Sequence, residues 1–210
     1  PSNISMAEAA ALPLAGLTAL QGLTTQGHIQ KDQKVLIFGG SGGVGSLAIQ
    51  MAKALGASEV TATGSNVDLI KSFGADVVVN YREQNLMEAL KGRDFDLVYD
   101  TVGGYEHWEI AQASMKSTGY FVTIVGDGGS FLKTVTSFLW RKMYGKVFRG
   151  PQYSLFLTDT TSPAVVEDMK KMTDLVEKGS VKPILDDTQY ELTTKGVHDM
   201  IKASKSHRAK

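Results

Sequence analysis

The chain has 210 residues, of which 42% are hydrophobic and 21% charged, enough to bury a substantial core as one domain or at most two small ones. Its 22 basic and 22 acidic residues cancel, which argues against a nucleic-acid partner and against binding to an anionic membrane. The absence of cysteine excludes disulfides, a thiolate nucleophile and cysteine-ligated zinc within this sequence.

The predicted elements alternate between helices and short apolar strands. Two helices are expected over 5–12 and 14–25, separated by Pro13. Strands and helices then follow in turn, at 35–38 and 44–55, 60–63 and 66–73, 77–80 and 85–91, and 96–100 and 105–114, before a strand at 120–125. This alternation predicts an α/β fold of the Rossmann type, a doubly wound parallel sheet with helices on both faces.

The rest of the chain is less regular. Residues 131–144 are rich in large apolar side chains, which we interpret as packing, the alternatives being a substrate entrance or an interface. A further strand is expected over 153–157, and helices over 165–178 and 193–204. No internal repeat, low-complexity segment or linker divides the sequence, so we expect one folded unit.

The most informative motif lies in the turn between the strand at 35–38 and the helix that follows. Gly40-x-Gly42-x-x-Gly45 has the spacing of dinucleotide-binding turns. In such turns one glycine allows a sharp bend, one lets the backbone approach a pyrophosphate and one lets the helix pack closely on the sheet. The helix then presents unpaired N–H groups and its positive dipole end to the phosphates. A phosphate-loop triphosphatase would need Gly-Lys-Ser/Thr here, whereas Gly45 is followed by Ser46.

Other classes of site have little support. His28, His107, His198 and His207 lack the short spacings of metal-ligand pairs, so we expect no metal site. No apolar run approaches about 18 residues, so we expect no membrane span. None of the seven tyrosines is followed at the fourth place by the lysine of short-chain dehydrogenases, and the catalytic residues stay unassigned.

The choice between NAD and NADP is usually made at the end of the second strand, where an Asp or Glu accepts hydrogen bonds from the ribose 2′-OH. Here the chain has Gly64 and Ser65 instead of a carboxylate. Glu59 lies at the opposite end of the strand, and Asp68 falls inside the next helix. Lys71 is either a phosphate contact or an exposed helix lysine. The sequence therefore favours NADPH over NADH.

Two further turns follow the fourth and fifth strands, at 100–104 and 125–127. Ligands of open parallel sheets lie outside the carboxyl ends of the strands, so we expect both turns to border the cofactor, the alternative being two ordinary strand-to-helix turns. Tyr81 follows the third strand and is either a contact of the adenosine or a surface tyrosine.

Together these segments resemble the medium-chain dehydrogenase/reductase superfamily, and within it the zinc-free branch of quinone oxidoreductases and enone reductases. The resemblance rests on the alanine-rich segment 9–19, the glycine turn 39–45, the segment 74–82 and the segment 96–104. In that family a GroES-like β domain precedes the cofactor domain, and a last strand returns to it. The resemblance implies that 1–210 is a single dinucleotide-binding domain, with N-terminal helices over 1–30 and a Rossmann core over 31–210. The GroES-like domain and the last strand are then expected outside this sequence.

The resemblance also implies a set of cofactor contacts. The pyrophosphate would be held by Ser41, Gly42, Gly43 and Val44, with Gly45 in the same turn. The adenosine and its 2′-phosphate would meet Gly64, Ser65 and Tyr81. The middle of the cofactor would be lined by Thr101 and Val125. The nicotinamide would lie beside Thr18 and under Phe156 and Leu157, with His207 near a terminal contact.

Zinc-dependent relatives place a cysteine ligand where this chain has Leu14. Leucine cannot coordinate zinc, so we expect no zinc and no alcohol oxidation. The implied activity of the complete protein is hydride transfer from NADPH to a quinone or an α,β-unsaturated carbonyl, with the isolated domain binding NADPH without appreciable turnover. One departure weakens the NADPH assignment, because the end of the second strand lacks the basic residue often found there.

Two alternatives remain at this point: an enoyl-reductase module of a fatty-acid or polyketide synthase, and a non-catalytic nucleotide-binding protein of the crystallin kind. We expect a small-molecule quinone or enone as the binding partner, and a homodimer is left open. The first residues include no initiator methionine and resemble no signal or transit peptide. We therefore expect a cytoplasmic protein whose start lies upstream, with mitochondrial and plastid locations open.

Overall fold

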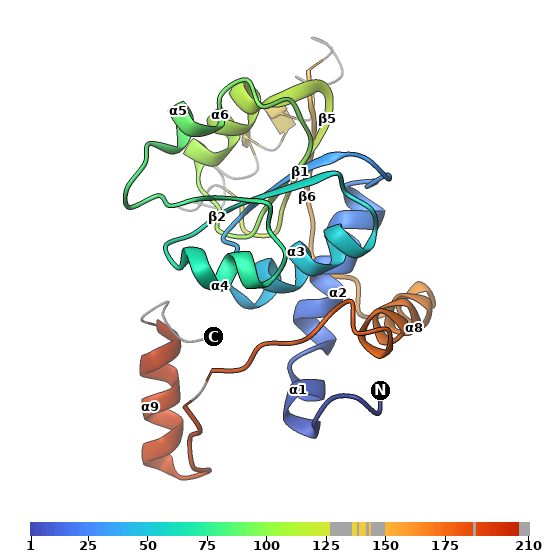
Figure 1. The fold of residues 1–210 in the computed structure, drawn as a ribbon, viewed down its shortest axis with the longest axis vertical. Helices are drawn as coiled ribbons and strands as arrows, with labels where there is room; N and C mark the ends of the chain where they lie inside the picture. The colour runs from blue at the N-terminus through green and yellow to red at the C-terminus, as the bar shows by residue number, and fades with distance from the viewer. Residues whose placement is uncertain (127–135, 138, 142, 144–149, 187, 206–210) are drawn as a thin grey trace.

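The computed structural model describes residues 1–126, 136–137, 139–141, 143, 150–186 and 188–205. In this part of the chain the centre is a six-stranded sheet in the order β3-β2-β1-β4-β5-β6, and each neighbouring pair of strands is parallel (Figure 1). The strands are β1 (Lys34–Phe38), β2 (Glu59–Thr63), β3 (Val77–Val79), β4 (Phe95–Asp100), β5 (Met115–Thr123) and β6 (Gln152–Leu155). The strand order reverses between β1 and β4, so the predicted doubly wound sheet is confirmed and its ligand-binding edge is at that point.

The described helices are α1 (Met6–Ala10), α2 (Pro13–Gln21), α3 (Gly43–Ala54), α4 (Val67–Ser72), α5 (Leu86–Leu90), α6 (Tyr105–Ser114), α8 (Ala164–Glu177) and α9 (Thr194–Lys205). Their bounds follow the predicted ones closely, except for the second. There the predicted helix over 14–25 divides into α2 and a short π-helix, Gly22–Gln26. The π-helix is followed by Gly27 and the turn into β1.

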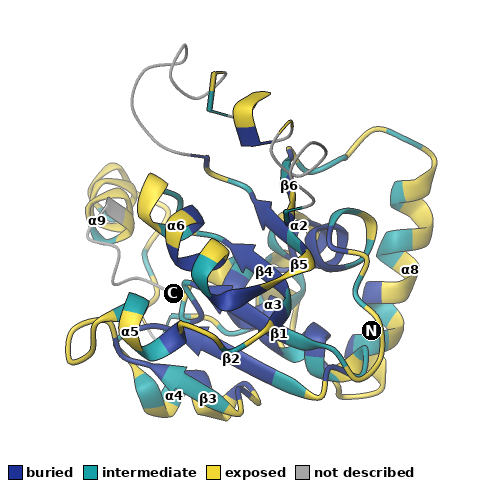
Figure 2. Cartoon of the chain, turned by 90° about the horizontal axis from the view of Figure 1, so that it is seen from above, coloured by how far each residue is buried: buried dark blue, intermediate teal, exposed yellow. Residues whose placement is uncertain are grey.

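The two faces of the sheet are covered by different helices (Figures 1 and 2). Successive side chains of a strand point to opposite faces. Val35 and Ile37 of β1 therefore join the core formed with α2, α3 and α8, whereas Leu36 and Phe38 join the core formed with α5 and α6. All four are fully buried, which explains why β1 reads as a continuous apolar run rather than an alternating one.

Strand β5 differs most from its prediction. It begins at Met115, five residues before the predicted start, because α6 ends at Ser114 and the chain becomes extended at once. Met115 pairs with Phe95, but the three exposed polar residues at 116–118 conceal the strand in the sequence. The strand also ends earlier, at Thr123, whose hydroxyl accepts hydrogen bonds from the backbone N–H groups of the turn that follows.

Most of the predicted irregular segment, 131–144, lies outside the described residues. Within its described part, Arg141 is buried at 2% exposure. Its guanidinium lies 5.2, 5.4 and 5.1 Å from the ring centroids of Tyr105, Trp108 and Tyr153. Such cation–π packing fixes this part of the segment against α6 and β6.

The C-terminal helices occupy different surroundings. α8 packs on α2, where Met172 lies so close to Gly16 that a Cβ at that glycine would collide with the methionine sulfur. α9 stands apart from the sheet in Figure 1 and is reached through an extended segment. Among the described helices, none is long and apolar enough to cross a membrane.

Candidate cofactor-binding site

The glycine turn after β1 is fastened to the ends of the two neighbouring strands. The chain bends at Gly39, which adopts a φ of 83° and so carries the left-handed conformation that favours glycine. The Gly39 N–H donates to the Thr63 hydroxyl at 3.2 Å, and the Gly40 N–H donates to the Thr63 carbonyl oxygen at 2.8 Å. On the other side, the Thr101 hydroxyl donates to the Phe38 carbonyl oxygen at 2.7 Å. The sharp bend is therefore one residue before the first glycine of the motif.

The glycines of the turn face different surroundings. A Cβ on Gly40 would lie 2.9 Å from the Cβ of Ala62, and a Cβ on Gly45 would collide with the Gly39 carbonyl oxygen. A Cβ on Gly43 would meet none of the described residues within 4 Å. Gly40 and Gly45 therefore allow close packing of the turn and helix, whereas Gly43 leaves open space in front of the helix.

That open space lies at the N-terminus of α3, which begins at Gly43 after the N-cap residue Gly42. No described side chain caps this end, and the first turn contains no acidic residue. The first N–H groups of a helix have no partner within the helix, and they favour an anion in front of them. The predicted pyrophosphate cradle thus has free donors and no competing carboxylate in the first turn.

A pocket of about 790 Å³ opens on one side of this helix end, within the usual range for small-molecule sites. It lies at the carboxyl ends of β1, β2 and β4, as expected for a switch point. Of the predicted contacts, it brings together Ser41, Gly42, Gly64, Tyr81 and Thr101. The other lining residues are Gly39, Thr63, Leu86, Val102, His107 and Ser204.

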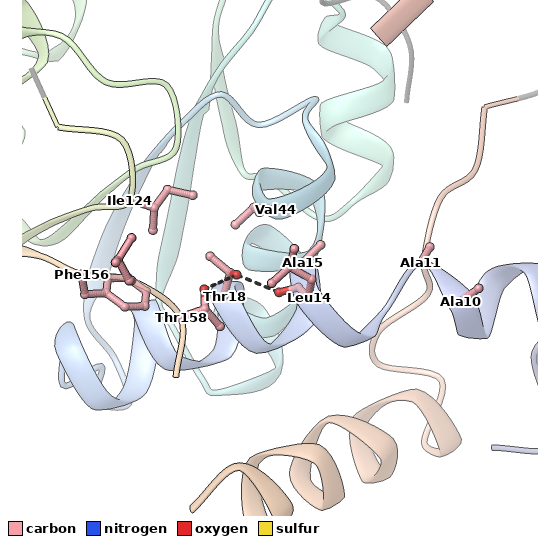
Figure 3. A pocket seen from close by; sticks show the side chains of 10 residues that line it. Ala10, Ala11, Leu14, Ala15, Thr18, Val44, Ile124, Phe156 and Thr158 are labelled. Atoms are coloured by element: carbon pink, nitrogen blue, oxygen red, sulfur yellow. Dashed lines mark hydrogen bonds between the residues drawn. The ribbon is translucent and has the colours of Figure 1, made fainter. Parts of the chain in front are cut away.

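A smaller pocket of about 430 Å³ lies on the other side of the turn (Figure 3). Of the predicted contacts, it brings together Thr18, Val44, Phe156 and Leu157. The other lining residues are Ala10, Ala11, Leu14, Ala15, Ile124 and Thr158. Val44 in this pocket and Ser41 in the larger one are three residues apart, so the two pockets adjoin across the first turn of α3.

The remaining predicted contacts lie outside these two pockets. Gly45 is buried inside α3, and Gly43 lines a small hollow at the helix end. Ser65 is half-buried directly after Gly64, and Val125 is 51% exposed beside Gly103. His207 lies outside the described residues.

Carboxylates are kept away from the larger pocket, with one buried exception behind it. No acidic side chain is among its described lining residues. Glu59 is at the opposite end of β2, where it accepts a hydrogen bond of 2.8 Å from Arg93, and Asp68 is exposed on α4. Asp100, at 1% exposure, lies behind the turn and accepts hydrogen bonds from the Thr123 hydroxyl and two backbone N–H groups.

His107 is a lining residue that the sequence analysis did not assign. Its Nδ1 lies 2.9 Å from Asp100 Oδ1, and its ring stacks on Phe38 with the centroids 4.2 Å apart. Asp100 and Phe38 thereby fix the imidazole at the pocket wall. A histidine in the first turn of the helix after β4 is visible in the sequence, but its return to Asp100 depends on how α6 packs on the sheet.

The smaller pocket contains a pair of hydroxyl groups. Thr18 Oγ1 lies 2.7 Å from the Leu14 carbonyl oxygen and 2.6 Å from Thr158 Oγ1 (Figure 3). The Thr18 carbonyl oxygen accepts a hydrogen bond of 2.8 Å from the Tyr99 hydroxyl, and burial raises the pKa of Tyr99 well above its ordinary value. Thr158 was not predicted as a site residue. Its position directly after the predicted strand over 153–157 is the feature of the sequence that could have indicated it.

The loop from Thr158 into α8 is fixed on α2. The Asp159 N–H donates to Gln21 Oε1 at 2.9 Å, and Gln21 Nε2 donates to the Asp159 carbonyl oxygen at 3.0 Å. The Asp159 carboxylate accepts hydrogen bonds from the Ser162 side chain and from the backbone N–H groups of Thr161 and Ser162, which lower its pKa to about 2. These bonds hold the wall of the smaller pocket in place.

The smaller pocket does not fit a catalytic zinc ion. Zinc needs imidazole, thiolate or carboxylate ligands. The described lining residues, Leu14 among them, have only hydroxyl groups and apolar side chains. Across the described part of the chain, no group of three or more His, Cys, Asp or Glu side chains is arranged to hold a metal.

Comparisons with known proteins agree with this geometry. Residues 43–154, more than half of the chain, match the family described as zinc-binding dehydrogenase. The chain is 39% identical over 189 residues to a 2-methylene-furan-3-one reductase of Solanum lycopersicum, and 33% identical over 189 residues to an NADPH-dependent alkenal/one oxidoreductase of Arabidopsis thaliana chloroplasts. Each match covers 89% of this chain and 41% of the relative.

A solved structure of Escherichia coli quinone oxidoreductase complexed with NADPH superposes with a TM-score of 0.74 at 28% identity. That match covers 98% of this chain and 64% of the E. coli chain. The chain spans less than half the length of each of the two curated relatives, the Solanum and the Arabidopsis protein. The sheet order, the glycine turn and these matches together place the chain in the zinc-binding dehydrogenase family, in the quinone and enone oxidoreductase branch of the medium-chain dehydrogenase/reductase superfamily.

Proposed function

We propose that this chain is the NADPH-binding domain of an oxidoreductase that transfers hydride to quinones or α,β-unsaturated carbonyls. The observation that carries the proposal is the pair of pockets that adjoin across the uncapped N-terminus of α3. A dinucleotide has two halves joined by a pyrophosphate, and this arrangement offers two cavities joined by an anion site. Ser41, Gly42, Gly43 and Val44 would hold the pyrophosphate between them.

The adenosine half would occupy the larger pocket. Gly64, Ser65 and Tyr81 would meet the adenosine and its 2′-phosphate, and Thr101 would border the middle of the cofactor. The absence of a carboxylate among the described lining residues supports NADPH over NADH, because an acidic side chain there would repel the 2′-phosphate. The Arabidopsis relative is named as NADPH-dependent, and the E. coli structure is a complex with NADPH.

The nicotinamide half would occupy the smaller pocket, beside Thr18 and near Phe156. When bound, the cofactor supplies the hydride, and its reacting carbon must come within about 3 to 3.5 Å of the acceptor carbon. The walls formed by Leu14, Ile124 and Phe156 are apolar, which suits a conjugated and largely apolar acceptor. The names of the relatives, a 2-methylene-furan-3-one reductase, an alkenal/one oxidoreductase and a quinone oxidoreductase, support the same acceptor class.

The proposal can be tested by an NADPH oxidation assay on the whole protein that contains this chain. We expect it to oxidise NADPH with phenanthrenequinone or a simple enone, and we expect the 210-residue chain alone to bind NADPH without appreciable turnover. Ser65→Asp should lower kcat/KM for NADPH about tenfold, since charge-assisted contacts to the 2′-phosphate would be replaced by repulsion. Ser72→Asp, which adds the same charge at the end of α4, is the matched control.

Two results would contradict the proposal. If the whole protein oxidises NADPH with neither acceptor, the alternative of a nucleotide-binding protein without catalytic activity would be favoured. A preference for NADH in the unsubstituted protein would reject the NADPH assignment while leaving the dinucleotide site in place.

A further inference from the structure

The two hydroxyl groups of the smaller pocket have a defined hydrogen-bond direction. The Leu14 carbonyl oxygen can only accept, so the Thr18 hydroxyl, 2.7 Å away, donates its single proton to it. The Thr18 and Thr158 oxygens are 2.6 Å apart, and the proton between them must then come from Thr158. Thr158 thus donates to Thr18, and Thr18 donates to Leu14. Dashed lines mark both hydrogen bonds in Figure 3.

This direction leaves Thr158 with a particular recognition property. A hydroxyl has one proton and two acceptor lone pairs. With its proton committed to Thr18, Thr158 Oγ1 can offer the pocket only a lone pair. The hydroxyl therefore selects for a ligand group that donates a hydrogen bond at this point.

The position of Thr158 is as well defined as its direction. The Phe156 N–H donates to the Thr123 carbonyl oxygen at 3.2 Å, which holds the chain before Thr158 along β5. The two hydrogen bonds between Asp159 and Gln21 hold the chain after it on α2. Thr158 is half-buried, and its pocket neighbours other than Thr18 have apolar side chains. Thr18 Oγ1 already donates to Leu14 and accepts from Thr158, and Thr18 is only 5% exposed. The more accessible side-chain acceptor for a donor group of the ligand is therefore Thr158.

We infer that Thr158 recognises the carboxamide of the nicotinamide ring, its Oγ1 accepting a hydrogen bond from the carboxamide NH₂. This inference rests on the proposed function, which puts the nicotinamide in the smaller pocket. The carboxamide carries the only hydrogen-bond donor of the nicotinamide ring system. An acetyl group in its place keeps the carbonyl oxygen and the approximate shape but has no N–H to donate.

The test compares NADP⁺ with its acetylpyridine analogue by calorimetric titration of the chain. A neutral hydrogen bond predicts that the unsubstituted chain binds NADP⁺ roughly 3- to 10-fold more tightly than the analogue. Thr158→Val should bring this ratio to about 1, mainly by weakening NADP⁺, because valine keeps the shape and removes the acceptor. Thr158→Ser should keep the ratio, and so should Thr25→Val, which makes the same change at an exposed threonine.

The outcomes separate this inference from the proposed function. If the chain binds NADP⁺ and Thr158→Val leaves the ratio unchanged, or if the analogue binds as tightly as NADP⁺ to the unsubstituted chain, the role of Thr158 is rejected and the cofactor site stands. If the chain binds neither compound, the proposed function fails and the inference fails with it. Retained affinity for the analogue shows that the valine variant is folded.

Discussion

Gly43 and Gly45 stand two residues apart in the same turn, yet a side chain would meet open space at the first and a carbonyl oxygen at the second. In the sequence, Gly45 is the last glycine of the dinucleotide motif, whereas Gly43 occupies one of its unrestricted positions. Their difference arises from the bend at Gly39, which turns its carbonyl oxygen toward α3. A side chain at Gly43 should therefore affect cofactor binding, whereas a side chain at Gly45 should affect folding stability.

Alanine substitutions at these positions should have opposite effects. Gly43→Ala should leave the free energy of unfolding unchanged or raise it by up to about 1 kcal/mol, because alanine favours the helix. It should also weaken NADPH binding at least about tenfold by occupying the space in front of the N–H groups. Gly45→Ala should lower the free energy of unfolding by about 1 to 3 kcal/mol through overpacking. Urea denaturation measures the free energy of unfolding, and calorimetry measures the affinity for NADPH. An equal loss of stability in the two variants would contradict the different roles of Gly43 and Gly45.

At the same scale, the sequence identifies the site residues that belong to a backbone pattern and misses those that depend on packing. The glycine turn, Tyr81 and Thr101 follow strands in the sequence, so their place at the carboxyl edge could be predicted. Thr158 and His107 contribute through a partner that is distant in the chain or on another element. Sequence spacing alone does not indicate that Thr18 is the partner of Thr158, or that Asp100 is the partner of His107.

At the scale of the elements, the loop between β6 and α8 connects the sheet to the helix that covers α2. Asp159 begins this connection with its Asx-type hydrogen bonds to the first residues before α8. Its carboxylate is held in the ionised form, with a pKa lowered from 3.8 to about 2. A lowered folded-state pKa contributes stability that is complete above the unfolded value and is lost as the pH falls through the folded one.

The difference in urea midpoint between the unsubstituted chain and Asp159→Ala should therefore be constant from pH 7 to about pH 4 and should shrink between about pH 4 and about pH 2. Asp68→Ala, at an exposed carboxylate of α4, shows what the loss of any acidic side chain does. A midpoint difference for Asp159→Ala that persists undiminished at pH 2 would show that the carboxylate does not hold this loop.

The element predictions succeed where apolar periodicity is unbroken and fail where polar or local chemistry decides. β1 is predicted well because its continuous apolar run suits a strand that is buried on both faces, and α3 because its apolar residues recur at helical spacing. The early start of β5 is concealed by its exposed polar residues at 116–118, and its early end depends on the hydrogen bonds of Thr123 to the next turn. Periodicity contains neither kind of information.

At the scale of the whole molecule, the reversal of strand order between β1 and β4 accounts for the site. The reversal sends the chain to opposite sides of β1, so the glycine turn opens at the edge of the sheet between two pockets. The alternating sequence predicts a doubly wound parallel sheet, whereas the order of its strands comes from the structure. The division into two pockets could not be predicted, since it requires the helix α2 and the loop at 156–158 to close one side.

Binding of NADPH across the two pockets is tested most directly by calorimetric titration of the chain with NADPH and with NADH. NADPH should bind at one site per chain, about tenfold or more tightly than NADH, because the 2′-phosphate would gain charge-assisted hydrogen bonds near Ser65 and Tyr81. No measurable binding of NADPH, or binding of NADH at least as tight, would contradict it.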